Sequence, residues 1–176
     1  MNLVTNRDVE CLIMCGRYRL SRRKEYLAKH FGVDPDEMDW EPRYNIAPTQ
    51  QIPVLRQDHK GPIRHASMMR WGLIPYWAKD PSIGARTINA RAETVATRPA
   101  FRESLERRRC LIPADGFYEW KCSGKTKQPF CLEVEDGKLF AFAGLWAARR
   151  QPDRELYHPH DRTQPAAGWT FTIACP

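Results

Sequence analysis

Residues 110–120 read CLIPADGFYEW, residues 129–146 read PFCLEVEDGKLFAFAGLW, and residues 169–176 read WTFTIACP. Each stretch is rich in β-branched or aromatic side chains, and turn-forming residues separate them, which is the pattern of β-strands. Asp136-Gly137 divides the second stretch, and this dipeptide is typical of a tight turn between paired strands. The second half of the chain therefore predicts a sheet with a hairpin turn in EDGK.

The first half of the chain adds further strands and short helices. QIPVLRQ at 51–57 and IRHASMMRWGLIP at 63–75 have strand composition, whereas SRRKEYLAKHFGV at 21–33 and AFRESLERRR at 100–109 have helical spacing of apolar residues. We expect an α+β fold that is dominated by strands, with a partly closed antiparallel sheet or barrel and two or three short helices. In the first helix we expect Ser21 as N-cap, Gly32 as the stop, and Tyr26, Leu27, His30 and Phe31 facing the core.

The composition indicates one basic domain. The 176 residues include 28 Lys and Arg against 21 Asp and Glu, a formal net charge of +7. This excess favours nucleic acid or another polyanion as partner, although a basic surface without a partner has the same composition. No apolar run is long enough to span a membrane, and residues 1–13 lack the apolar core of a secretory signal. We therefore expect a cytoplasmic protein.

A long segment with little periodicity, residues 76–101, lies between the predicted strands and the second helix. Such segments in compact domains are often functional loops. Tyr76 and Trp77 open this segment, where they are either core anchors or a platform for a stacked base. Asn89 lies later in the same segment. Glu119 lies between two large aromatics, which favours partial desolvation and proton transfer, although an alternating strand would also place it in solvent.

Six short blocks together resemble the SOS response-associated peptidase (SRAP) family, and they follow the family's order. They cover nearly the whole of residues 14–146. The blocks are MCGRY at 14–18, RYNIAPTQ at 43–50, RWGLIPYWAKD at 70–80, TINARAETV at 87–95, RRCLIPADGFYEWK at 108–121 and QPFCLEV at 128–134.

This resemblance implies recognition of abasic sites in single-stranded DNA by a monomer that needs no cofactor or metal. It implies covalent attachment through Cys15, once that residue is N-terminal, by a thiazolidine ring that shields the lesion. Asn89 would position the cysteine and the sugar, and Glu119 would transfer protons. Arg17 and Arg91 would meet phosphates, and Trp77 would stack on a base. Arg70 and Arg86 complete the DNA-binding set.

The two ends of the chain depart from the family's pattern. We expect residues 1–13 to be a disordered lead or a wrongly assigned start, because thiazolidine formation requires a free α-amine on Cys15. We expect the domain at 14–176 to be incomplete at its C-terminal end, because the chain stops where the family's usual catalytic histidine block would follow. His160 in the polar loop is a weak substitute, and it forms at best a poor metal ligand set with His158.

Three functions remain open at this point. The first is the covalent abasic-site chemistry that the resemblance implies. The second is a cysteine peptidase that acts on protein, for which Cys15 would need an activating base while it is still internal. The third is a module that binds single-stranded DNA without chemistry, if the lead or the missing end abolishes the reaction.

Overall fold

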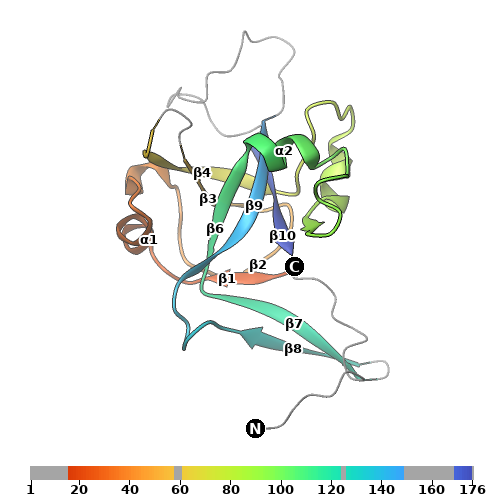
Figure 1. The fold of residues 1–176 in the computed structure, drawn as a ribbon. Coiled ribbons are helices and arrows are strands. Elements are labelled where there is room, and N and C mark those ends of the chain that lie inside the picture. The colour runs from red at the N-terminus through yellow and green to blue at the C-terminus, as the bar shows by residue number, and fades with distance from the viewer. Residues whose placement is uncertain (1–15, 58–60, 124–125, 149–168, 176) are drawn as a thin grey trace.

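The chain folds into two β-sheets with short helices at their margins (Figure 1). The computed structural model describes residues 16–57, 61–123, 126–148 and 169–175; only the backbone is described at 123, 169–171, 174 and 175. The larger sheet has the strand order β4-β3-β6-β9-β10-β5. Its strands are β3 (Gln51–Gln57), β4 (Arg64–Trp71), β5 (Asn89–Arg91), β6 (Arg109–Ala114), β9 (Phe140–Ala148) and β10 (Trp169–Cys175).

The strand β10 partly closes the larger sheet through its pairings. It pairs antiparallel with β9, and it pairs parallel with both β5 and β4. The pairing with β4, at Arg70 and Trp71, links strands that are distant in the order of the sheet. A strand-dominated, partly closed α+β architecture is therefore confirmed, with two parallel pairings added to the antiparallel ones.

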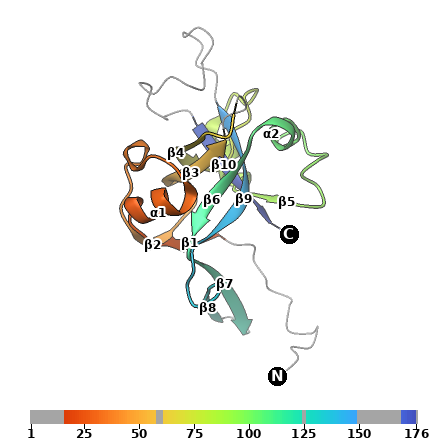
Figure 2. The same cartoon turned by 60° about the vertical axis from the view of Figure 1, so that its left-hand side comes forward.

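The smaller sheet has the order β2-β1-β7-β8. Its β7–β8 hairpin extends away from the larger sheet in both views (Figures 1 and 2). The strand β8 is an edge strand, and all its residues are exposed. The four strands are β1 (Tyr18–Leu20), β2 (Arg43–Ile46), β7 (Gly116–Ser123) and β8 (Thr126–Leu132).

Two local predictions, one strand and one hairpin, are wrong because the chain changes sheets there. CLIPADGFYEW is not one strand: β6 ends at Ala114, β7 begins at Gly116, and Asp115 lies at the corner between the two sheets. The EDGK segment does form a turn, with positive φ at Glu135, Asp136 and Gly137. This turn joins β8 to β9, which belong to different sheets and do not pair, so no hairpin forms there.

The helix α1 (Lys24–Phe31) ends as the sequence predicts, at Gly32 in the left-handed conformation (φ 67°). The prediction for its start is wrong. Arg23 occupies the N-cap without a side-chain hydrogen bond, and Ser21 uses its hydroxyl elsewhere. Leu27 and Phe31 are buried as predicted, whereas Tyr26 and His30 are exposed. The remaining helical segments are α2 (Arg102–Arg107) and the 3-10 turns η1 (Pro35–Glu37) and η2 (Pro81–Arg86).

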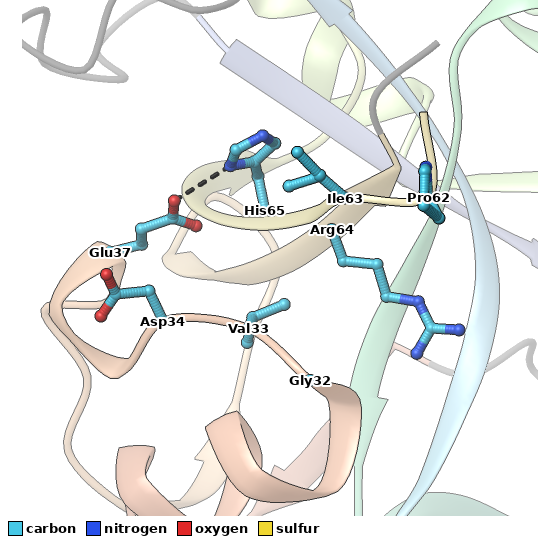
Figure 3. A pocket seen from close by; sticks show the side chains of 8 residues that line it. All are labelled: Gly32, Val33, Asp34, Glu37, Pro62, Ile63, Arg64 and His65. Carbon is cyan, nitrogen blue, oxygen red and sulfur yellow. Dashed lines mark hydrogen bonds and ion pairs between the residues drawn. The ribbon is translucent and has the colours of Figure 1, made fainter. Parts of the chain in front are cut away.

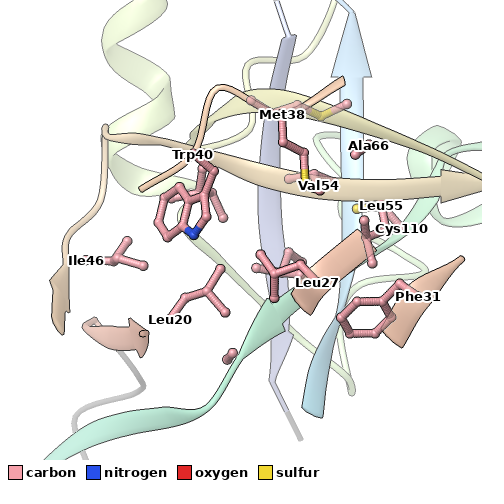
Figure 4. Close-up of a cluster of buried hydrophobic side chains, with 14 of the residues drawn as sticks. Leu20, Leu27, Phe31, Met38, Trp40, Ile46, Val54, Leu55, Ala66 and Cys110 are labelled. Carbon is pink, nitrogen blue, oxygen red and sulfur yellow. The ribbon is translucent and has the colours of Figure 1, made fainter. Parts of the chain in front are cut away.

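The main hydrophobic core lies where α1 and both sheets meet (Figure 4). Tyr18 at its centre is fully buried, and its ring makes edge-to-face contacts with Trp71 at 5.5 Å and with Phe142 at 5.9 Å. A second core cluster beneath α2 contains Leu73, Phe101 and Leu145. No helix in the described part of the chain is long and apolar enough to cross a membrane.

Candidate active site

The pairing of β1 with β7 places Glu119 beside the start of β1. Tyr18 is opposite Phe117, and the Tyr118 amide donates to the Arg17 carbonyl at 3.0 Å. Continued two residues beyond Tyr18, this register would set Gly16 opposite Glu119. Cys15 itself lies outside the described residues, but its Cα is covalently held about 3.8 Å from that of Gly16. The residue that follows the predicted nucleophile is therefore opposite the predicted proton-transfer group, although 103 positions separate Gly16 from Glu119 in the sequence.

The environment of Glu119 differs from the one that the sequence predicts. Successive side chains of a strand point to opposite faces, so Tyr118 and Trp120 lie on the face away from Glu119 and do not enclose its carboxylate. Glu119 shares its face with Phe117, whose ring packs against Phe142 at 5.9 Å. One carboxylate oxygen of Glu119 is out of contact with solvent. Partial desolvation is present, and it comes from the inner face of the sheet.

Asn89 belongs to the larger sheet. It is the first residue of β5 and is only 8% exposed, with its Oδ1 atom shielded from solvent. The strand pairing sets Asn89 beside Ile173, which belongs to the main core cluster together with Tyr18. Asn89 therefore borders the main core, to which Tyr18 of β1 also belongs.

A short chain of contacts connects β1 to the start of β5. The Tyr18 ring contacts the Trp71 ring, and the Trp71 indole nitrogen donates to the Ile88 carbonyl at 2.8 Å. Ile88 directly precedes Asn89. The residue three positions after Cys15 is therefore coupled by two contacts to the residue before Asn89.

Two of the predicted phosphate-binding arginines lie next to these positions. Arg17 precedes β1, and its guanidinium donates to the Asn45 side chain at 2.9 Å. This contact orients the Arg17 head without neutralising its charge. Arg91 ends β5, two residues after Asn89, and is exposed. Arg91 is thus close in sequence to the buried Asn89, and the Arg17 carbonyl is hydrogen-bonded to Tyr118, the residue before Glu119.

Trp77 and Tyr76 lie on the surface and are not core anchors. They are 50% and 52% exposed, respectively. The base of their loop is fixed, because the Leu73 amide donates to the Thr87 carbonyl at 3.3 Å and the Thr87 hydroxyl donates back to the Leu73 carbonyl at 2.5 Å. A half-exposed tryptophan on an anchored loop suits the predicted stacking role, which stays a prediction.

Arg70 lies near the end of β4 and Arg86 lies at the end of η2, before and after Tyr76 and Trp77 in the sequence. An Arg70 guanidinium nitrogen packs closely over Gly84, only 3.0 Å from the point where a Cβ on that glycine would lie. Arg86 ends η2 and is exposed. Hydrogen bonds from Ser82, and then the charge of Arg86, lower the pKa of Asp80. Arg70 supports the loop, and its contact with DNA stays a prediction, as does that of Arg86.

Asp115 is a residue that the sequence did not single out. It is fully buried at the corner between β6 and β7, and its carboxylate accepts hydrogen bonds from Arg19 Nε at 2.7 Å, from the Ser21 amide at 2.6 Å and from the Ser21 hydroxyl at 2.8 Å. The hydrogen bond and charge of this carboxylate raise the pKa of Arg19. Asp115 therefore clamps β1 to the corner that carries Glu119.

A pocket of about 460 Å³ lies elsewhere, between the end of α1, η1 and the start of β4 (Figure 3). Its Glu37 and His65 side chains point toward each other and pair at 3.0 Å, and Glu37 also accepts from the Ala66 amide at 2.7 Å. None of the predicted site residues lines it. The paired groups hold η1 against β4.

The remaining sequence candidates are not placed. His158 and His160 lie outside the described residues, as does Cys15. Within the described residues, no group of three or more His, Cys, Asp or Glu side chains gathers in a way that could hold a metal ion.

Comparison with known proteins places these features in a family. Residues 14–173 match SOS response associated peptidase (SRAP). Abasic site processing protein YoqW of Bacillus subtilis is 44% identical over 143 residues, which are 80% of this chain and 63% of that protein. Abasic site processing protein YedK of Escherichia coli is 34% identical over 171 residues, which are 92% of this chain and 68% of that protein. The chain thus spans less than two thirds of the Bacillus relative.

Solved structures share the fold of this chain. A protein from Bacteroides thetaiotaomicron superposes with a TM-score of 0.74 at 24% identity, over 91% of this chain and 67% of that one, and so has the same fold. A phage-related protein from Bordetella bronchiseptica superposes with a TM-score of 0.63 at 28% identity, over 91% of this chain and 68% of that one. The two-sheet α+β fold is that of a known structural class. The chain belongs to the SRAP family.

Proposed function

We propose that this protein recognises abasic sites in single-stranded DNA and attaches to them covalently through Cys15. The observation that carries the proposal is the β1–β7 register, whose continuation past Arg17 brings the residue that follows Cys15 opposite a partly desolvated carboxylate, Glu119. The names of relatives at 34–44% identity, which describe abasic site processing, support the same class of substrate.

The reaction joins an amine, a thiol and an aldehyde. The neutral α-amine of Cys15 adds to the C1′ aldehyde of the open-ring sugar, and the carbinolamine loses its hydroxyl as water to give an imine. The Cys15 thiolate then adds to the imine carbon, and the nitrogen takes up a proton, which closes a five-membered thiazolidine. The balance is one water released, with no oxidant or reductant. An α-amine, with a pKa near 8, is neutral far more often at pH 7 than a lysine amine near 10.4.

Glu119 serves the two proton transfers of this sequence. It delivers a proton to the departing hydroxyl and receives one from the attacking amine, which general acid–base catalysis by a positioned carboxyl can accelerate by about 10²–10⁴-fold. Asn89 supplies a buried amide that orients the sugar and the amine. Arg17 and Arg91 neutralise flanking phosphates, and Trp77 stacks on a base.

The reaction requires that Cys15 carry a free α-amine. A chain that retains residues 1–14 has an amide at this position, and its nitrogen cannot form the imine. We therefore expect adduct formation from a chain that begins at Cys15 and none from a chain that retains residues 1–14.

Intact-mass spectrometry of the protein after incubation with an abasic single-stranded oligonucleotide tests the proposal. The chain that begins at Cys15 should gain the mass of the oligonucleotide minus one water, and Cys15→Ala should not form the stable ring. Glu119→Gln should slow adduct formation at least tenfold with little change in DNA affinity, whereas Glu93→Gln, an exposed matched control, should not. Absence of an adduct with the free-cysteine chain would refute the proposed function.

A further inference from the structure

The strand β8 carries exposed apolar side chains on one face. Phe130 is 49% exposed and Leu132 is 43% exposed, and they occupy alternate positions of an edge strand. Alternate residues of a strand point to the same side, so the two side chains form a continuous row. Proteins usually blunt an edge strand with charge, and a large exposed apolar row often marks an interaction surface.

The register of β7 and β8 places this row beside the candidate active site. Phe130 is directly opposite Glu119, Leu132 is opposite Phe117, and Gln128 is opposite Lys121. Directly opposed side chains have Cβ atoms about 5 Å apart. Phe130 is therefore the cross-strand neighbour of Glu119 on the same face, on the side of Glu119 away from β1.

A cation completes the arrangement. Lys121 lies two residues after Glu119, on the same face of β7, and is exposed. Proteins that bind single-stranded nucleic acid combine aromatic side chains, on which bases stack, with cations that meet the backbone phosphates. A half-exposed aromatic ring, with a lysine near it and Glu119 opposite it, has these components.

We propose that Phe130 is a stacking platform for the base next to the abasic nucleotide, with Lys121 meeting the adjoining phosphate. This inference rests on the proposed function, because it takes the lesion to lie at Glu119. A lesion that has lost its base offers nothing to stack on, so contact with its neighbour would help to hold the open sugar in place. Phe130 is a positioning residue in this scheme, and it takes no part in the chemistry.

The test measures equilibrium binding and adduct rate with three oligonucleotides. One has purines on both sides of the abasic site, and the other two replace either the 5′ or the 3′ neighbour with an inert tetrahydrofuran spacer. Phe130→Leu should lower affinity for the purine-flanked strand by about 5- to 100-fold, and Phe130→Trp should retain it. Ile63→Ala removes an apolar side chain that is 60% exposed but lies outside both sheets' paired strands, and it should have no effect.

The spacer strands make the test specific for stacking. In the wild type, one of the two replacements should lower affinity about as much as Phe130→Leu does, and in Phe130→Leu that replacement should cost nothing further. Equal losses from the spacer in both proteins would overturn the inference, as would a Phe130→Leu variant that binds like the wild type. A concentration-dependent dimer abolished by Phe130→Leu, with unchanged DNA binding, would also overturn it, because the row would then join two copies of the chain.

The outcome separates this inference from the proposed function. If the wild type forms the adduct and Phe130→Leu binds normally, only the stacking platform is refuted. If the wild type forms no adduct, the proposed reaction is refuted, and the spacer experiment still reports on Phe130 through noncovalent affinity. Thermal unfolding of each variant shows whether the edge strand tolerates the substitution, and Phe130→Trp keeps the test decisive if Phe130→Leu unfolds.

Discussion

Removal of the Asp115 carboxylate should destabilise the protein strongly. The carboxylate is fully buried and accepts three short hydrogen bonds, from Arg19 Nε and from the amide and hydroxyl of Ser21. Loss of one partner from a buried ion pair costs about 3–5 kcal/mol. Arg19 is 20% exposed and also pairs with Glu133 at 2.8 Å, so its charge is not left alone. We therefore expect about 3–4 kcal/mol for Asp115→Ala.

Urea unfolding followed by circular dichroism measures this loss. Total stabilities of domains are about 5–15 kcal/mol, so the shift of the midpoint should be large. Ser21→Ala removes one of the three donors and should cost about 1 kcal/mol. If Asp115→Ala cost less than 1 kcal/mol, or no more than Ser21→Ala, the clamp would not stabilise the corner. The clamp also sets the β1–β7 register, so Asp115→Ala should slow adduct formation as well.

The remaining predictions concern backbone strain and alkaline pH. Gly72 has φ 120°, and a Cβ there would lie 2.5 Å from the Gly84 carbonyl oxygen. Gly72→Ala should therefore lower the free energy of unfolding in urea by at least about 2 kcal/mol. The control Gly61→Ala should be nearly neutral, because the space around Gly61 is open. Burial raises the pKa of the Cys110 thiol. The neutral thiol makes its full contribution to the free energy of unfolding below the unfolded pKa of about 8.5. This contribution is lost as the pH rises above that value, by up to about 1.4 kcal/mol per pH unit. Burial raises the pKa of Tyr18 too, which adds to the loss above about pH 10. Unfolding free energies from pH 7 to 10.5 should show this decline, and Cys110→Ala should flatten it between pH 8.5 and 10; an unchanged slope in that variant would contradict the assignment.

Several elements follow from the sequence because their causes are local. The strand at 51–57 has the predicted limits, since the apolar side chains of Ile52, Val54 and Leu55 mark it locally. Gly32 ends α1 because the left-handed conformation there favours glycine. The six ordered blocks also indicate the SRAP family, which the match over residues 14–173 confirms.

Other features depend on contacts between distant segments. Ser21 is of a residue type that is favoured at a helix N-cap, yet its hydroxyl donates to Asp115, 94 positions away. A buried carboxylate needs donors, and this demand outweighs one helix cap, which is worth about 1 kcal/mol. The exposure of Tyr26 also depends on distant segments, because the sheets cover the opposite side of α1.

The sequence by itself determined the family, the strand-rich composition and the residue types that the proposed chemistry uses. Only the tertiary structure decided that Asp115 marks a change of sheet, that the turn at Asp136-Gly137 joins two sheets, and that Phe130 lies opposite Glu119. The physical reason is that periodicity reports which side chains one strand would bury. Sheet membership and register depend instead on which distant strand supplies the hydrogen bonds and the matching apolar face.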